Sequence, residues 1–336
     1  MAELGEFELI GRFFDRPARD PDVILGVGDD AALLRVAPGH ELVLAVDMMV
    51  EGRHFLPGAD AEGLGHKVLA VNLSDMAAMG ARPRWALLAG ALPDSDAAWL
   101  EAFSRGLFAL ADAHGVALVG GDTTRGPRNL CLTIAGEVPA GQAIRRAGAL
   151  PGDDVWVSGE LGGAMLALAA LQGRTTLAAG QLAPLRRRLE RPEPRVALGI
   201  ALRGTASAML DVSDGLTGDL GHILDASGVG ARIDLDRLPC AAPLAARRTG
   251  AERELALGCL LAGGDDYELL FSARNAARDR VVAIGREVGV PVARIGKVTP
   301  REAGLVVRGE DGTPLAALPR AFDHFAAPSA AQGGRA

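Results

Sequence analysis

The chain has 336 residues, of which 49% are hydrophobic, and a formal net charge of −7. This length accommodates two ordinary domains, and the apolar content indicates that most of the chain folds. The arginines are scattered and form no basic stripe, so the sequence lacks the electrostatic footprint of a nucleic-acid-binding surface.

The cysteines and the apolar runs restrict the cellular setting. Cys131, Cys240 and Cys259 are far apart and contain no C-x-x-C pair, so neither a disulfide framework nor a thiolate zinc site is predicted. Residues 1–11 lack the apolar core of a signal sequence, and the apolar run 161–171 is too short to span a bilayer. We therefore expect a cytoplasmic protein that uses neither membrane nor nucleic acid.

The order of predicted elements indicates two α/β domains. In the first, helices alternate with strands, with helices expected at 62–79 and 95–114 and strands at 42–46, 85–92, 116–119 and 130–138. A stretch rich in Gly, Pro and Arg, 139–152, then predicts a boundary near residue 150, which gives domains at 1–150 and 151–326. In the second domain we expect helices at 161–172, 193–204 and 215–227 and strands at 154–158, 206–212, 231–235, 267–272 and 292–296. Residues 327–336 read as a disordered tail.

Aspartates close four apolar, strand-like runs, which end at Asp47, Asp122, Asp211 and Asp265. Two of these runs end in the same tripeptide, Gly-Gly-Asp, which suggests that the two halves arose by duplication. Asp30 and Asp75 add carboxylates in a loop and a helix. Buried carboxylates without a partner are too costly to keep, and hard cations such as Mg²⁺ take oxygen ligands and bind phosphates. The pattern therefore predicts magnesium in a cleft shared by both halves.

Two short segments combine acids with hydroxyl groups. Residues 122–127 place an aspartate, two threonines and an arginine in a predicted turn after a strand, and residues 211–215 repeat an acid, hydroxyl, acid order. A turn with these side chains can bind metal and phosphate together. The alternative is that each segment is an ordinary Asx or Ser/Thr turn without a ligand. Arg145 and Arg146 either meet phosphates or decorate a linker.

The familiar nucleotide and hydrolase motifs do not fit. Gly26-x-Gly28-x-x-Ala31 imitates a dinucleotide fingerprint, but Asp29 and Asp30 would repel a pyrophosphate and no helix is predicted after Ala31. The Walker A, protein-kinase, zinc-hydrolase and serine-hydrolase signatures are absent. His54, an isolated histidine, would not be selected on its own.

Taken together, these motifs resemble the thiamine-monophosphate kinase family, in order along nearly the whole chain from residue 5 to residue 325. The segments that carry the resemblance are Gly28-Asp29-Asp30-Ala31-Ala32, Glu51-Gly52-Arg53-His54-Phe55, 67–75, 120–127, 213–216 and 266–269. The resemblance implies a two-domain aminoimidazole ribonucleotide synthetase-like fold of the α/β (α+β) class. Its N-terminal domain would have a mixed sheet with helices on one face, and would form a homodimer through these sheets.

The resemblance also implies an activity: transfer of the γ-phosphoryl group of ATP to thiamine monophosphate, with several Mg²⁺ ions. By matching motif, the metal ligands would be Asp30, Asp47, Asp75, Asp122, Asp211 and Asp214, of which Asp30, Asp75, Asp122 and Asp214 would be catalytic. Gly121, Asp122, Arg146 and Ser213 would bind ATP. His54, Asp265 and Phe322 would contact the substrate.

The chain departs from the family pattern at two places. Ala45 and Val46 stand where the family has hydroxyl residues, and Asp265 stands where it has glutamate. Whether K⁺ assists stays open. Two alternatives remain: another ATP-dependent enzyme of the superfamily, such as an aminoimidazole ribonucleotide or selenophosphate synthetase, and a non-catalytic nucleotide-binding protein. A selenophosphate synthetase typically has a reactive cysteine or selenocysteine in a glycine-rich N-terminal segment, and this chain has none there. Loss of metal ligands would favour a non-catalytic protein, and the sequence shows no such loss.

Overall fold

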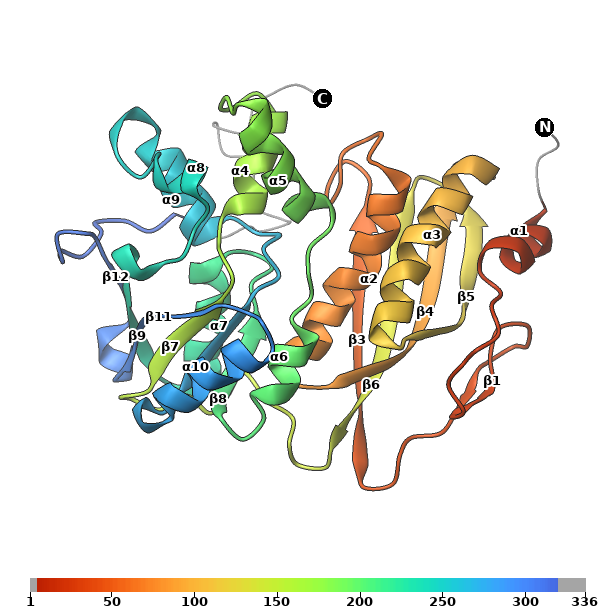
Figure 1. The fold of residues 1–336 in the computed structure, drawn as a ribbon, viewed down its shortest axis with the longest axis horizontal. Coiled ribbons are helices and arrows are strands. Elements are labelled where there is room, and N and C mark those ends of the chain that lie inside the picture. The colour runs from red at the N-terminus through yellow and green to blue at the C-terminus, as the bar shows by residue number, and fades with distance from the viewer. Residues whose placement is uncertain (1–4, 320–336) are drawn as a thin grey trace.

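A four-stranded mixed sheet forms the N-terminal half of the computed structural model, which describes residues 5–319 (Figure 1). Its strands lie in the order β3-β6-β4-β5; β4 and β5 are parallel, and the other neighbours are antiparallel. The bounds are β3 His40–Val50, β4 Arg82–Leu92, β5 Ala117–Arg125 and β6 Asn129–Pro139. A small β1–β2 pair, Val23–Leu25 and Leu33–Leu34, and the helix α1, Glu6–Phe13, precede the sheet.

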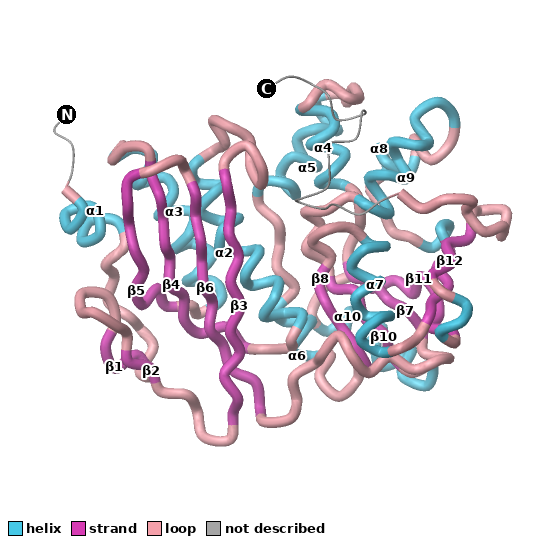
Figure 2. Tube along the Cα trace, turned by 180° about the vertical axis from the view of Figure 1, so that it is seen from behind, coloured by secondary structure: helices cyan, strands magenta, loops and turns pink. Residues whose placement is uncertain are grey.

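Helices cover one face of this sheet. Figures 1 and 2 both place α2 (Ala61–Ala78) and α3 (Ala97–His114) on the same side. Alternation along β3 turns Ala45, Asp47 and Met49 toward these helices. The opposite face exposes large apolar side chains: Leu42, Leu44, Val46, Met48 and Leu87. The expected mixed sheet with helices on one face is confirmed.

The helix α2 is buried on nearly all sides because it lies between the two halves of the molecule. It packs against α3, β3 and β6 of its own half and against α6 and β8 of the other half. Glycine permits the closest of these contacts: a Cβ at Gly65 would lie 2.0 Å from the carbonyl oxygen of Phe103. The side chains of α2 therefore contact both halves of the molecule.

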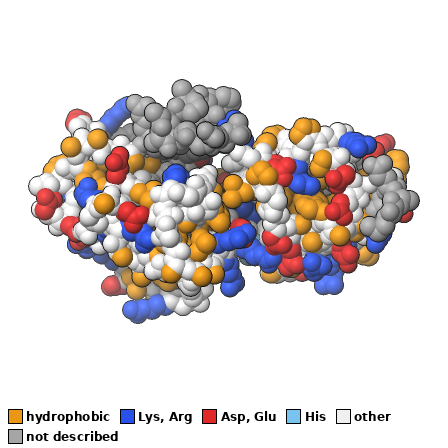
Figure 3. All heavy atoms as spheres, turned by 90° about the horizontal axis from the view of Figure 1, so that it is seen from above, with side chains coloured by type: hydrophobic (Ala, Val, Ile, Leu, Met, Phe, Trp, Pro, Cys, Tyr) orange, Lys and Arg blue, Asp and Glu red, His pale blue; other side chains and the backbone are white. Residues whose placement is uncertain are grey.

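A six-stranded sheet forms the second half, in the order β12-β9-β11-β7-β10-β8. Only β9 and β12 pair in parallel among these strands of the described chain. The strand bounds are β7 Asp154–Ser158, β8 Ala206–Asp211, β9 Gly230–Asp234, β10 Leu269–Ala273, β11 Val292–Thr299 and β12 Leu305–Arg308. The helices are α4 Gly163–Leu171, α5 Ala179–Glu190, α6 Val196–Ala201, α7 Leu216–Ser227, α8 Ala242–Ala245, α9 Arg253–Ala262 and α10 Arg278–Glu287. Seen from above, the two halves form two lobes (Figure 3).

Three local predictions were wrong. The apolar run before Gly263 is the helix α9 and not a strand, because a run this short carries no decisive period. Residues 122–125 continue β5 instead of turning, since their backbone pairs with residues 89–92 of β4. Asp47 likewise lies inside β3, three residues before its end. The two Gly-Gly-Asp tripeptides are therefore not equivalent, and they give no support to an internal duplication.

Candidate active site

The junction between the two halves brings acids from both together. Asp75 and its neighbour Ser74 lie on α2, and Asp211 ends β8. The Ser74 hydroxyl donates a hydrogen bond of 2.7 Å to Oδ2 of Asp211, across 137 residues of sequence. Asp47 reaches the same place from the helix-covered face of β3, and its charge acts on Asp75. We call Asp47, Asp75, Asp211 and Asp214 the acidic cluster.

The acidic cluster consists of carboxylates that destabilise one another. Burial, together with the charges of Asp211 and Asp214, raises the pKa of Asp47 to about 6. Burial and the charges of Asp211 and Asp47 raise the pKa of Asp75 to about 8, against an attraction from Arg146. Burial also raises the pKa of Asp211, although the Ser74 hydroxyl opposes this. The site therefore favours bound positive charge at neutral pH.

Asp219 is a further acid of the site that the sequence analysis missed. It lies in the first turn of α7, where its Oδ2 accepts hydrogen bonds from the backbone N–H groups of Asp214 (3.1 Å) and Gly215 (3.0 Å). Burial, with the charges of Asp211 and Asp214, raises its pKa to about 7. The available signal was an acid in the first turn of a helix that follows Asp214-Gly215, where such a side chain caps the loop.

Asp30 and Asp122 lie elsewhere in the chain. Both are exposed, and both line a broad pocket of about 1060 Å³ over the open face of the N-terminal sheet, as does Gly121. Strand β5, which carries Asp122, is the edge strand opposite β3. Within residues 5–319, no three His, Cys, Asp or Glu side chains are close enough to enclose a metal ion. One chain thus places the six predicted metal ligands in two groups.

The donor set of the acidic cluster nevertheless fits a hard divalent cation. Its members are carboxylates, which Mg²⁺ prefers, and burial costs them the solvation that would otherwise offset their repulsion. Arg146 is exposed, and its charge lowers the pKa of Asp75 and Asp211 without reversing the net rise of either. Bound cations would offset the negative charge of these carboxylates.

A smaller pocket of about 200 Å³ lies between α2 and the second half of the chain, and we call it the acceptor pocket. His54, Lys67 and Asp265 all line it. Nδ1 of His54 accepts a hydrogen bond of 3.0 Å from the backbone N–H of Val50, so the other ring nitrogen carries the proton of the neutral ring. Asp265 forms an ion pair with Lys67 at 2.8 Å. Phe322, the third predicted substrate contact, lies outside the described residues.

Backbone contacts fasten the acceptor pocket to the acidic cluster. The N–H of Asp265 donates to the carbonyl of Ser213 at 3.0 Å, and the N–H of Tyr267 donates to that of Val212 at 2.8 Å. Gly264 is required here, since a Cβ would lie 2.2 Å from the Ser213 oxygen. The loops that carry Asp214 and Asp265 are therefore joined through their backbones.

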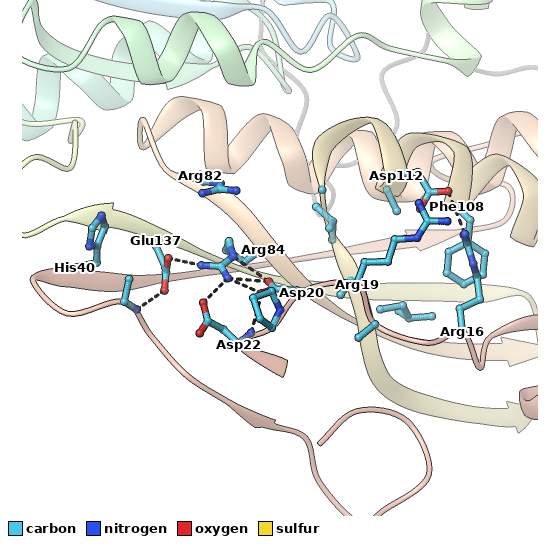
Figure 4. Close-up of a pocket in the computed structure, with 18 of the residues that line it drawn as sticks. Arg16, Arg19, Asp20, Asp22, His40, Arg82, Arg84, Phe108, Asp112 and Glu137 are labelled. Atoms are coloured by element: carbon cyan, nitrogen blue, oxygen red, sulfur yellow. Dashed lines mark hydrogen bonds and ion pairs between the residues drawn. The ribbon is translucent and has the colours of Figure 1, made fainter. Parts of the chain in front are cut away.

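A third pocket, of about 730 Å³, is rich in charge, and three of its acids share one arginine (Figure 4). Arg84 donates to Asp20 and Glu137 at 2.7 Å and to Asp22 at 2.9 Å. These pairs join the segment before β1 to the sheet. We therefore assign this charge cluster to the scaffold.

Comparisons with known proteins agree with this arrangement. The family models for AIR synthase related protein match the N-terminal domain at residues 28–138 and the C-terminal domain at residues 150–308. The thiamine-monophosphate kinase of Escherichia coli K12 is 47% identical over 327 residues, which cover 96% of this chain and 99% of the relative.

Solved structures give the same result. The crystal structure of thiamine-monophosphate kinase from Stenotrophomonas maltophilia matches with a TM-score of 0.82 at 46% identity, covering 94% of this chain and 99% of that one. AaThiL, in complex with AMPPCP and TMP, matches with a TM-score of 0.73 at 29% identity, covering 87% and 89%. Within residues 5–319, no helix is long and apolar enough to cross a membrane. The chain belongs to the thiamine-monophosphate kinase family of AIR synthase related proteins.

Proposed function

We propose that this chain transfers the γ-phosphoryl group of ATP to thiamine monophosphate, yielding thiamine diphosphate and ADP. This reaction is the last step of thiamine diphosphate synthesis. Relatives of 46–47% identity carry this activity in their names, and one structural neighbour was solved with AMPPCP and TMP. The observation that carries the proposal is the link between the acidic cluster and the acceptor pocket: Asp265, which lines the pocket, donates its backbone N–H to the carbonyl of Ser213, next to Asp214. The acidic cluster would bind metal and the polyphosphate of ATP, and the acceptor pocket would bind thiamine monophosphate.

We further propose that Asp47, Asp75, Asp211 and Asp214 hold Mg²⁺. When bound, Mg²⁺ would neutralise the phosphates of the two reactants. The second pKa of a phosphate monoester is about 6, so the acceptor phosphate is largely ionised near neutral pH and needs no strong general base. The remaining task of the chain is to orient the two reacting groups. Arg146 and Ser213 lie beside the acidic cluster for contact with ATP, and Asp265 offers a carboxylate to the cationic thiazolium.

The open face of the N-terminal sheet supports our proposal of a homodimer. Its exposed side chains form a contiguous apolar strip along β3, whose members are between 48% and 63% exposed: Leu42, Leu44, Val46 and Met48. An exposed apolar strip of this kind marks a protein interface. Asp30, Gly121 and Asp122 line the pocket over this face, so we propose that each copy lends these three residues to the ATP and metal site of its partner.

Substitution of Leu44 by arginine tests the homodimer. A charge in the apolar strip should convert the dimer to a monomer and lower activity, while leaving the monomer folded. Sedimentation velocity and circular dichroism measure these effects. A variant that is monomeric and fully active would refute the sharing of Asp30 and Asp122, and a wild-type monomer would refute the dimer itself.

The activity has a direct test. Purified protein is incubated with Mg²⁺, ATP and thiamine monophosphate, and the products are separated by chromatography. We expect thiamine diphosphate and ADP in equal amounts. ATP cleavage without thiamine diphosphate would keep the superfamily and refute the acceptor. Omission of K⁺ from the same assay measures whether a monovalent ion contributes.

The compartment is also a proposal. All three cysteines are present as free thiols in the structure, and a cytoplasmic location suits unpaired thiols.

A further inference from the structure

Lys67 is a buried cation that lines the acceptor pocket. Its side chain is 4% exposed, and its Nζ lies 2.8 Å from Oδ1 of Asp265. Lysine is almost never buried this deeply without a partner. The chain contains only one other lysine, Lys297. The ion pair links α2 to the loop after α9, and so crosses the junction between the two halves, as the Ser74–Asp211 hydrogen bond does.

The position of Lys67 on α2 connects the two parts of the site. Lys67 precedes Ser74 by seven residues and Asp75 by eight, which is about two helical turns, so these side chains share one face of the helix. The rise over eight residues is about 12 Å. One face of one helix therefore contacts the acceptor pocket at Lys67 and the acidic cluster at Asp75.

Asp265, the partner of Lys67, is held in an unusual conformation. Its φ is +66°, in the left-handed region, where a residue other than glycine stays only if its surroundings hold it. The Tyr267 hydroxyl donates to Oδ1 of Asp265 at 3.2 Å, the oxygen that Lys67 also contacts. Two groups therefore act on one oxygen, and together they fix the plane of the carboxylate.

The ion pair between Lys67 and Asp265 affects the charge balance of the acceptor pocket. Burial raises the pKa of Tyr267, and the charges of Asp265, Asp47 and Asp211 raise it further, so these carboxylates act on one side chain. Without Lys67, Asp265 would add one more uncompensated negative charge at the point where an acceptor phosphate must enter. With Lys67, the pocket keeps a carboxylate for a cationic ring and does not repel the phosphate of the same molecule.

We propose that Lys67 is a positioning and specificity residue of the acceptor pocket. It holds Asp265 in the pocket with His54 and offsets the charge of Asp265, so that an acceptor with both a cationic ring and a phosphate monoester can bind. This inference rests on the proposed function, and it adds to that function a residue that acts through Asp265.

The test compares Michaelis constants for the two substrates. Lys67→Met keeps the apolar stem and removes the charge. We expect the KM for thiamine monophosphate to rise by at least about tenfold, because one partner of a buried charge pair is lost. The KM for ATP should stay within about twofold, because a residue that acts in one pocket changes binding in that pocket. Lys297→Met is the matched control, with both KM values unchanged. A loss of thermal stability with both KM values raised together would indicate a structural role and overturn the proposal.

A double-mutant cycle then separates action through Asp265 from direct contact with the acceptor. In an Asp265→Asn background, Lys67→Met should change the KM for thiamine monophosphate by less than about twofold, because the charge that Lys67 offsets is gone. Equal effects in both backgrounds would overturn the proposed action through Asp265. Lys67→Gln, which can still donate to Oδ1, should recover part of the loss, and it replaces the methionine variant if that variant does not fold.

Different results would refute the proposed function and the proposed role of Lys67. If the wild-type protein forms no thiamine diphosphate, the proposed function fails. If the wild type is active and Lys67→Met leaves the KM for thiamine monophosphate unchanged, only the role of Lys67 fails.

Discussion

Two groups of partly or fully buried acids in this chain have opposite electrostatic surroundings. In the scaffold, the Arg84 guanidinium lies between Asp20, Asp22 and Glu137 (Figure 4). Burial raises the pKa of Asp20, but hydrogen bonds from Arg84 outweigh this and hold that pKa below its ordinary value. In the acidic cluster, burial and mutual repulsion raise the pKa of Asp75 to about 8.

The difference separates acids that are paired within the fold from acids that repel one another. A carboxylate that is paired with a guanidinium inside the protein already has its counter-charge, and its removal harms folding. A carboxylate held near others without such a partner costs stability until a cation arrives. Carboxylates therefore stabilise the fold where they pair with Arg84 and destabilise it in the acidic cluster.

The largest expected effect is on catalysis, from Asp75→Asn. Turnover should fall by about a thousandfold or more, because a proposed metal ligand is lost. In metal-free protein at pH 8.5, however, unfolding should become less favourable by on the order of 2 kcal/mol, because the substitution removes a repelled charge. Turnover assays and thermal denaturation measure both effects. Asp112→Asn, an exposed change on α3, is the control, and an active Asp75→Asn protein would exclude Asp75 from the mechanism.

The scaffold acids should show the reverse behaviour. Arg84→Met leaves three carboxylates without their shared partner, and should cost about 3–5 kcal/mol of unfolding free energy. The protein that stays folded should keep its KM values, since Arg84 lines a different pocket from the acceptor pocket. Chemical denaturation gives the free energy, and Arg82→Met, an exposed arginine on the same strand, should change it by less than about 0.5 kcal/mol. Equal losses from both substitutions would contradict the assignment of Arg84.

The pH dependence of stability should distinguish the acidic cluster from the scaffold. The pKa of Asp75 rises from an ordinary 3.8 to about 8, and that of Asp47 to about 6. Between the ordinary pKa of 3.8 and these raised values, the folded state holds more protons than the unfolded state. The unfolding free energy of the metal-free protein should therefore fall as the pH rises from about 4 to 8. Each proton so held contributes a slope of about 1.4 kcal/mol per pH unit.

Magnesium should reverse that loss. Because the cation binds the ionised carboxylates, it should raise the melting temperature more at pH 8.5 than at pH 5.5. Denaturation with chelator and with Mg²⁺ at both pH values measures this. A stability that is independent of pH in chelator would show that the acids of the acidic cluster carry no excess protons.

The smallest expected effect concerns Ser74. Its hydroxyl donates to Oδ2 of Asp211 and orients that carboxylate. Ser74→Ala should weaken the apparent affinity for Mg²⁺ by about tenfold, the usual cost of losing a group that orients a ligand. The Mg²⁺ dependence of turnover measures it, and Ser74→Thr should restore most of the affinity. Unchanged affinity in the alanine variant would mean that Asp211 needs no such support.

Sequence alone determined the two α/β halves, the acids and their family, because periodic apolar runs and ordered motifs are local properties. It predicted Asp75 on a helix and Asp211 at the end of a strand, and both predictions were correct. It did not find Asp219, whose signal is a single acid in a helix turn, and it read α9 as a strand.

Only the tertiary structure decided which acids meet. The sequence does not distinguish among the six predicted metal ligands. The fold gathers Asp47, Asp75, Asp211 and Asp214 at the junction and leaves Asp30 and Asp122 over the open face of the sheet. The pairing of Lys67 with Asp265 also depends on packing between segments nearly 200 residues apart. Electrostatic energies depend on distance and burial in space, which the spacing of residues along the chain does not contain.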